Sequence, residues 1–106
     1  MNRQALEKLL QQGTDNALLR YTLGTLCLKE KDMEEAIQHL ERALELDPGH
    51  SASWKSYGKA LAASGQSKAA RAAYVKGIAN AETRGDIQAV KEMQVFLKRL
   101  SPPSTS

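Results

Sequence analysis

The feature of this chain that most constrains its fold is a set of six residues that occurs twice, 34 residues apart. In both copies the six residues fall at offsets 0, 3, 4, 7, 16 and 20, with small residues at offsets 4 and 16. A period of that length is typical of stacked helix-turn-helix units. The first copy consists of Arg20, Leu23, Gly24, Cys27, Ala36 and Leu40, and the second of Trp54, Tyr57, Gly58, Leu61, Ala70 and Tyr74.

Each copy contains two apolar stripes with helical spacing, and two such stripes can bury each other. The stripes of the second helices are Ala36, Leu40, Ala43 and Leu44, then Ala70, Tyr74, Gly77 and Ile78. A glycine inside an isolated helix costs about 1 kcal/mol relative to alanine. We therefore expect Gly24 and Gly58 to lie where a neighbouring backbone comes close, with Ala36 and Ala70 completing a short interhelix distance.

These residues resemble the tetratricopeptide repeat (TPR) family, and Pro48, at offset 28 of the first copy, completes the match. The resemblance implies an all-α fold of antiparallel helical hairpins stacked in a right-handed superhelix, with about six helices. It divides a single domain, residues 1–100, into repeat 1 over 17–50 and repeat 2 over 51–84.

Turn and cap residues predict the helix boundaries. Helices are expected over 2–12, 17–29, 33–46, 51–64, 67–83 and 87–100, with Asp32 and Ser51 as N-caps and Asp47-Pro48-Gly49 as a stop. The first helix carries Leu6, Leu9 and Leu10 at the sites of Leu40, Ala43 and Leu44, which indicates an N-terminal cap helix. Residues 101–106 contain two prolines and are expected to be a disordered tail.

The last helix does not continue the repeat at a spacing of 34 residues. That spacing would place Gln88, Lys91, Glu92 and Val95 at the buried sites of the pattern, and buried charges without partners are unfavourable. A shift of two residues instead places Val90, Met93 and Leu97 where Trp54, Tyr57 and Leu61 lie one unit earlier. We expect the connection near Arg84 to absorb this shift, and residues 86–100 to form a C-terminal cap helix rather than a third repeat.

Function in the resembled family lies on a concave face formed by the first helix of each unit. The resemblance thus implies a non-catalytic protein-protein interaction module, or adaptor, that binds a peptide or a partner helix in this groove. Tyr21 and Leu28 are the expected apolar anchors, and Lys55 and Lys59 the expected readers of charge, so the ligand would be acidic with an apolar anchor. The expected groove residues are Leu18, Tyr21, Thr22, Thr25, Leu28, Lys29, Ala52, Lys55, Ser56, Lys59 and Lys91, extended by Val95 and by Lys98 or Arg99.

Some members of the family hold the terminal carboxylate of chaperone tails with a lysine-asparagine-arginine clamp. At the corresponding sites this chain has Tyr21, Thr25 and Ser56 instead. The resemblance therefore does not imply capture of a chaperone carboxylate.

Charge divides the chain into two halves. Residues 1–50 hold six Lys or Arg and nine Asp or Glu, a net charge of −3, and residues 51–106 hold nine and three, a net charge of +6. A basic half is compatible with nucleic acid, but no aromatic platform accompanies the cations, so nucleic acid is not the expected partner. The opposed charges favour an alternative function, an assembly module that associates through its end helices; we expect a monomer or a weak homo-oligomer.

Catalysis is not expected. His39, predicted on an outward face, and His50, predicted in a loop, have no second ligand at metal spacing, and Cys27 is predicted to be a buried, inert thiol. No glycine-rich phosphate loop occurs, and no cofactor or metal is implied. The charged N-terminal segment resembles neither a secretory signal nor a membrane span, and one cysteine allows no intrachain disulfide, so the expected location is cytoplasmic.

Overall fold

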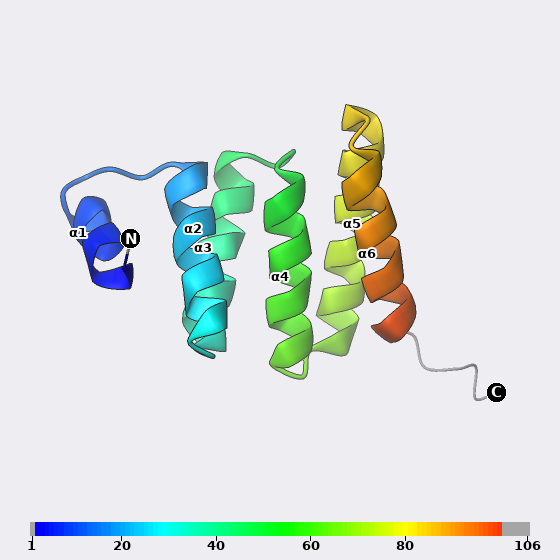
Figure 1. The fold of residues 1–106 in the computed structure, drawn as a ribbon, viewed down its shortest axis with the longest axis horizontal. Coiled ribbons are helices and arrows are strands. Elements are labelled where there is room, and N and C mark those ends of the chain that lie inside the picture. The colour runs from blue at the N-terminus through cyan, green and yellow to red at the C-terminus, as the bar shows by residue number, and fades with distance from the viewer. Residues whose placement is uncertain (1, 101–106) are drawn as a thin grey trace.

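A computed structural model describes residues 2–100, and over that range the chain forms six α-helices and no strand (Figure 1). The expected all-α fold of stacked helical hairpins is confirmed. Residues 101–106, expected to be disordered, lie outside the described residues. The helices are α1 (Arg3–Gln11), α2 (Ala17–Lys29), α3 (Met33–Leu46), α4 (Ser51–Ala63), α5 (Ser67–Arg84) and α6 (Ile87–Leu100).

The helices form two layers. Helix α2 packs on α3 and α4 packs on α5, so each expected repeat is an antiparallel hairpin. Helices α2, α4 and α6 form one layer, in which α4 contacts both neighbours, and they lie in front of α3 and α5 in Figure 1. In the other layer no Cα atom of α3 lies within 8 Å of one in α5. The layer of α2, α4 and α6 is thus continuous, whereas the other layer is open between α3 and α5.

Short polar side chains begin most of the helices. The side-chain oxygens of Asn2, Asn16 and Asp32 accept hydrogen bonds from backbone N–H groups three residues later, at 2.8, 2.8 and 3.3 Å. Asp86 does the same for α6 at 3.1 Å. These caps satisfy donors that the first turn leaves free, which explains why helix starts could be predicted closely.

The expected cap of α4 is wrong. Ser51 is the first residue inside the helix, and the N-cap position belongs to His50, whose side chain makes no capping hydrogen bond. The His50 ring instead has its Nδ1 atom 2.6 Å from the Ser53 hydroxyl. The preceding Pro48-Gly49 turn brings the chain into the helix one residue earlier than the cap rule suggests.

The two helical glycines of the repeated pattern face different neighbours from those expected. A Cβ atom on Gly24 would lie 2.5 Å from Cγ of Leu40, and one on Gly58 would fall against the ring of Tyr74. The nearest atoms thus belong to the large residue at offset 20, not to the backbone or to Ala36 and Ala70. Each glycine provides space for a bulky side chain of the opposite helix.

The two-residue shift in the last helix is confirmed. Met93 is fully buried, and its sulfur lies beside Gly77 of α5 together with Trp54 of α4. Lys91 and Val95, which a spacing of 34 residues would bury, are exposed. The shift lets α6 turn its apolar face toward α4 and α5 while its lysines stay in water.

The N-terminal helix packs through fewer leucines than its stripe suggested. Leu6 is buried against Leu19 and Leu23 of α2, with Leu10 beside them. Leu9, at the site of the buried Ala43, is 39% exposed. Arg3 of α1 also pairs with Glu30 and Asp32 at 2.9 and 3.0 Å, so charge as well as apolar contact holds α1 in place.

His39 lies inside the structure, so its predicted outward position is wrong. The residue is only 7% exposed, and Arg20 of α2 donates from Nη1 to its Nδ1 atom at 3.1 Å. Because arginine can only donate, the imidazole is neutral with its proton on Nε2, which has no hydrogen-bond partner within the described residues. Arg20 is itself held by the two carboxylate oxygens of Asp15, at 2.8 and 3.1 Å. Burial, and next the charge of Arg20, lower the pKa of His39.

Replacing Gly58 with alanine should destabilise the protein. The new methyl group would overlap the buried Tyr74 ring, and overpacking of this kind costs about 1–3 kcal/mol, more than the helix propensity that alanine gains. Urea unfolding followed by circular dichroism at 222 nm measures the change. Ala69→Gly, on an exposed site of α5, measures how much an exchange of alanine and glycine changes stability through helix propensity alone. A G58A variant as stable as the parent would show that the glycine is not required by packing.

Stability should fall as the solution becomes mildly acidic, in part through His39. The folded state lowers the pKa of His39 below its ordinary 6.5, so the unfolded state binds the proton more readily. The histidine's contribution is therefore complete above pH 6.5 and is lost as the pH falls below that value. Urea midpoints measured from about pH 7.5 to about pH 5 should drop less for His39→Gln than for the parent. Parallel curves for the two proteins would contradict the assignment of a neutral buried imidazole.

Candidate functional site

The expected groove residues all belong to α2, α4 and α6 and share the continuous layer, here called the α2–α4–α6 face. Their exposure differs widely. Leu18, Lys29, Lys59 and Lys91 are exposed, whereas Ser56 is only 7% exposed and presents little surface to a ligand. The remaining six are half-buried: Tyr21, Thr22, Thr25, Leu28, Ala52 and Lys55.

The α2 part of this face is apolar, but two of its side chains already have partners. Tyr21 and Leu28 pack against the core cluster around Leu40, and the Tyr21 ring meets the His50 ring edge to face, with centroids 5.0 Å apart. Leu18, one turn before Tyr21, is 68% exposed. A ligand would therefore meet Leu18 first, with Tyr21 as a fixed wall beside it. The hydroxyls of Thr22 and Thr25 donate to backbone carbonyls of α2 and remain free only as acceptors.

Lys55 is not a free cation. Its Nζ atom lies 2.7 Å from a carboxylate oxygen of Glu92 on α6, and this contact lowers the pKa of Glu92. The pair bridges α4 and α6 across the face. An acidic ligand that binds Lys55 must share its ammonium with Glu92 or displace Glu92.

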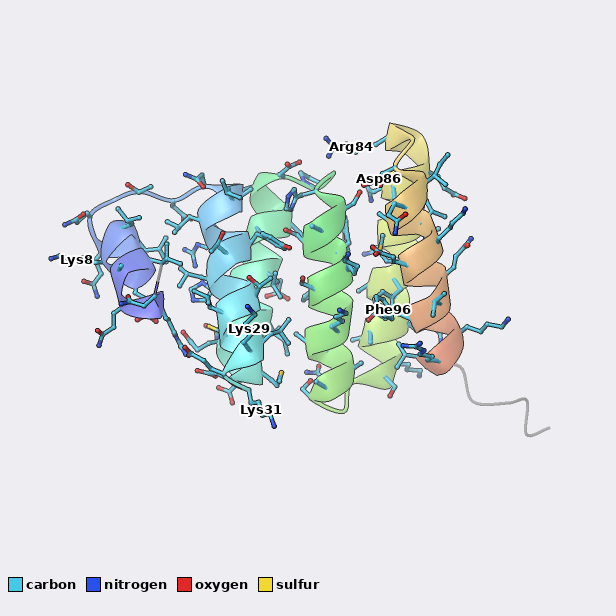
Figure 2. The ribbon with its side chains drawn as sticks, in the orientation of Figure 1. Lys8, Lys29, Lys31, Arg84, Asp86 and Phe96 are labelled. Atoms are coloured by element: carbon cyan, nitrogen blue, oxygen red, sulfur yellow. The ribbon has the colours of Figure 1, made fainter. Side chains whose placement is uncertain are left out.

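Two other cations flank an aromatic ring at the C-terminal end of α4 and α6. The Nζ atom of Lys59 lies 4.8 Å from the centroid of the Phe96 ring, and the guanidinium carbon of Arg99 lies 5.9 Å from it. The ring, labelled in Figure 2, forms part of an apolar cleft of about 280 Å³ with Tyr74 and Leu100. Phe96 is not among the groove residues that the sequence predicted. Phe96 and Arg99 are three residues apart on one helix, and this spacing could have indicated that their side chains lie next to each other.

A polar crevice of about 360 Å³ lies at the opposite end of the same helices. His50, the N-cap of α4, lines it together with Ser51 and Ala52 of that helix. The other lining residues are Arg84, at the end of α5, and Asp86, in the turn before α6, both labelled in Figure 2. Arg84 donates to the backbone carbonyl of Gly49 and so ties this turn to the loop between the repeats. Ala52 thus borders this crevice.

The one cysteine of the chain is not placed to act as a nucleophile. Cys27 is fully buried, and burial raises the pKa of its thiol to about 11, which leaves no thiolate near neutral pH. The part of the chain that the structure describes contains no cluster of three or more His, Cys, Asp or Glu residues that could hold a metal ion. None of the helices in residues 2–100 is long and apolar enough to cross a membrane.

Comparison with known proteins identifies the repeat. Residues 28–93 and residues 3–51 match two profiles described as tetratricopeptide repeat, and the first covers more than half of the chain. The chain belongs to the tetratricopeptide repeat family. TPR proteins generally act as protein-interaction modules and are typically not catalytic, so the partners to consider are proteins.

Several relatives share almost the full length of this TPR chain. The TPR repeat-containing protein PA0015 of Pseudomonas aeruginosa is 50% identical over 102 residues, which are 96% of this chain and 97% of that protein. The solution structure of protein BPP2914 from Bordetella parapertussis superposes with a TM-score of 0.83 at 47% identity, covering 94% of this chain and 87% of that one. A TPR domain protein from Salinibacter ruber, with a TM-score of 0.78 at 22% identity and coverages of 87% and 93%, shares the fold.

Proposed function

We propose that this TPR protein is a non-catalytic adaptor that binds an acidic peptide or partner helix with an apolar anchor along its α2–α4–α6 face. The observation that supports this function best is the pair of cations, Lys59 and Arg99, that line the apolar cleft at Phe96. Exposed Leu18 provides an apolar contact on the neighbouring α2. The face therefore offers an apolar part and a basic part to one ligand.

The two cations are available to a ligand carboxylate. Within the described residues neither Lys59 nor Arg99 forms an ion pair, and both are exposed. Their position beside the Phe96 ring restrains both side chains without pairing either with a carboxylate. Exposed ion pairs contribute only about 0–1 kcal/mol each, so most of the affinity would come from apolar surface buried at Leu18, Tyr21 and the cleft.

Lys55 has a second role in this proposal. Because Glu92 already pairs with it, Lys55 attracts an acidic ligand less strongly than an unpaired lysine would. Lys59 is consequently the better residue for testing charge recognition, since reversing Lys55 would also place two carboxylates side by side between α4 and α6.

Charge reversal at Lys59 should weaken binding of an acidic peptide. The probe is a fluorescein-labelled peptide with leucines at one end and glutamates at the other, measured by fluorescence anisotropy at low salt. We expect Lys59→Glu to lower affinity about tenfold and Leu18→Ala to lower it less, while Lys68→Glu, an equal charge change on an exposed site of α5, has little effect. Thermal unfolding of each variant confirms that the fold is retained.

Two results would contradict the proposal that the peptide binds in the groove. One is an equal loss in the Lys59 and Lys68 variants, because that would indicate attraction by net charge alone. The other is equal binding of a control peptide in which lysines replace the glutamates.

Assembly through the end helices is a second candidate function. Ile87 and Val95 on α6 are 65% and 48% exposed, and α6 contacts only α4 and α5 among the described helices. At the other end of the stack Leu9 of α1 is 39% exposed (Figure 1). The acidic first half and basic second half of the chain would favour head-to-tail contact.

If the chain assembles in this way, its apparent mass should rise with concentration. In sedimentation equilibrium we expect Val95→Lys to reduce the association because it places a charge in the contact, and added salt to weaken it by screening the opposed halves. Leu18→Lys, which adds the same charge on α2, should not change the mass. A single monomeric mass over the whole concentration range would exclude assembly.

A further inference from the structure

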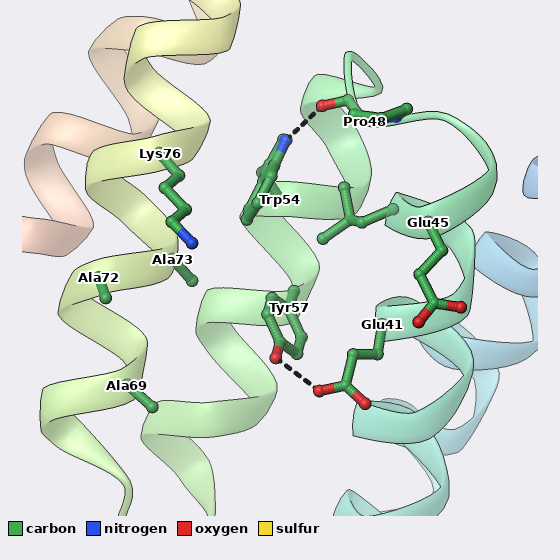
Figure 3. A pocket seen from close by; sticks show the side chains of 10 residues that line it. Glu41, Glu45, Pro48, Trp54, Tyr57, Ala69, Ala72, Ala73 and Lys76 are labelled. Atoms are coloured by element: carbon green, nitrogen blue, oxygen red, sulfur yellow. Dashed lines mark hydrogen bonds between the residues drawn. The ribbon is translucent and has the colours of Figure 1, made fainter.

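A hollow of about 490 Å³ lies on the side of the molecule opposite to the α2–α4–α6 face (Figure 3). It opens between α3 and α5, which have no Cα atoms within 8 Å of each other. Trp54 and Tyr57 of α4 form its floor, and Ala69, Ala72 and Ala73 of α5 form one wall. The hollow exists because three small side chains stand where the neighbouring helix is too distant to fill the space.

The first repeat closes the corresponding place with its own side chains. The residues 34 positions before Trp54 and Ala73 are Arg20 and His39, which bond to each other at 3.1 Å. His39 is nearly buried there, and Arg3 of α1 reaches Glu35, the residue equivalent to Ala69, at 3.7 Å. The two repeats thus share a backbone frame, but the second has alanines, Ala69 and Ala73, where the first has Glu35 and His39.

The aromatic floor presents apolar surface to the hollow. The indole N–H of Trp54 donates to the Pro48 carbonyl at 2.7 Å, and the Tyr57 hydroxyl donates to Glu41 at 3.0 Å. These bonds occupy the polar donors of both side chains and fix the rings, which meet at 60° with centroids 6.4 Å apart. An occupant therefore meets two aromatic rings and alanine methyl groups, which favour an apolar side chain.

The two lips of the hollow carry opposite charges. On the α3 lip Glu41 has only the neutral Tyr57 hydroxyl as a partner, whereas Glu45 is paired with Arg42 at 3.1 Å. On the α5 lip Lys76 forms no ion pair within the described residues, and its side chain extends toward the hollow in Figure 3. One uncompensated carboxylate thus faces one uncompensated ammonium across an apolar floor.

We propose that this hollow is a second partner site, which takes one apolar side chain flanked by a basic residue over Glu41 and an acidic residue over Lys76. The occupant is a segment of a partner protein with this order of charges, because that order pairs both lips and leaves neither charge unmatched. The site lies on the other side of α4 from Lys59 and Arg99. It is therefore independent of the proposed groove.

Trp54 supplies a direct test because it is the only tryptophan of the chain. The probes are three short capped peptides with a central leucine: one with arginine before it and glutamate after it, one with arginine on both sides, and one with glutamate on both sides. We expect the mixed peptide to shift the NMR signal of the Trp54 indole N–H at the lowest concentration. The other two should bind about two- to fivefold more weakly, the effect of one exposed ion pair.

A pair of matched variants tests the location. Ala72→Gln places in the hollow the side chain that the first repeat has at the same site, Gln38, and should weaken the mixed peptide about tenfold. Ala79→Gln makes the same change on an exposed site of α5, about two turns farther along and outside the hollow, and should not. Lys59→Glu, on the opposite side of α4, should leave this binding unchanged even if it abolishes binding to the groove.

Reversing the charge at Lys76 tests the order of charges that the hollow prefers in its occupant. Lys76→Glu should change the preference from the mixed peptide to the peptide with arginine on both sides, because both lips would then be acidic. The proposal is overturned if no peptide moves the Trp54 signal at millimolar concentration, if Ala72→Gln and Ala79→Gln behave alike, or if the flanking charges make no difference. It is also overturned if the Trp54 signal shifts with protein concentration alone, since that would identify a second copy as the occupant.

Discussion

The structure depends on the close approach of paired helices at positions that lack a side chain. Gly24 faces Leu40, Gly58 faces Tyr74, and Gly77 is enclosed by Trp54 and Met93. In each case a large apolar residue of the opposite helix fills the space that a Cβ atom would take, so helix separation and core packing are set by the same contact. A glycine would weaken an isolated helix, but here its missing side chain leaves the space in which the large residue of the opposite helix is buried. The repeat period follows from this requirement, because the same contact must recur in each hairpin.

The two repeats share this frame but use different side chains between neighbouring hairpins. Around the first repeat the gap is closed by arginines, carboxylates and the buried His39, a polar network that also fastens α1. Around the second repeat the equivalent positions are aromatic rings and alanines, which cannot reach across. Apolar hollows therefore remain around α4 and α5, on both sides of the layer. The apolar cleft at Phe96 belongs entirely to the half of the chain with the basic charge.

Features set by backbone chemistry could be predicted from the sequence. Helix starts at Asn16 and Asp32 and the shifted register of α6 follow from local capping and from the cost of burying Lys91, and neither needs knowledge of distant partners. Features set by contacts between helices could not. The burial of His39 depends on Arg20 reaching it from another helix, and the pairing of Lys55 with Glu92 joins residues 37 positions apart. The neighbours of the two glycines were misassigned for the same reason. Residue spacing predicts which face of a helix a glycine lies on, but not which side chain of the opposite helix comes nearest to it.

Helix α4 carries both proposed sites, and this arrangement follows from its place in the stack. It contacts α2, α3, α5 and α6, so no side of it faces solvent broadly, and its side chains emerge in two opposite directions. Trp54 and Tyr57 point to the hollow between α3 and α5, while Lys55 and Lys59 point to the α2–α4–α6 face. Because the two sets alternate along one helix, the two sites are separated by about one helix diameter, roughly 10 Å. The packing of Gly58 against Tyr74 holds α4 in place and therefore also fixes the distance between the two proposed sites. Two segments of one partner could then bind on opposite sides of α4 without any change in the helix.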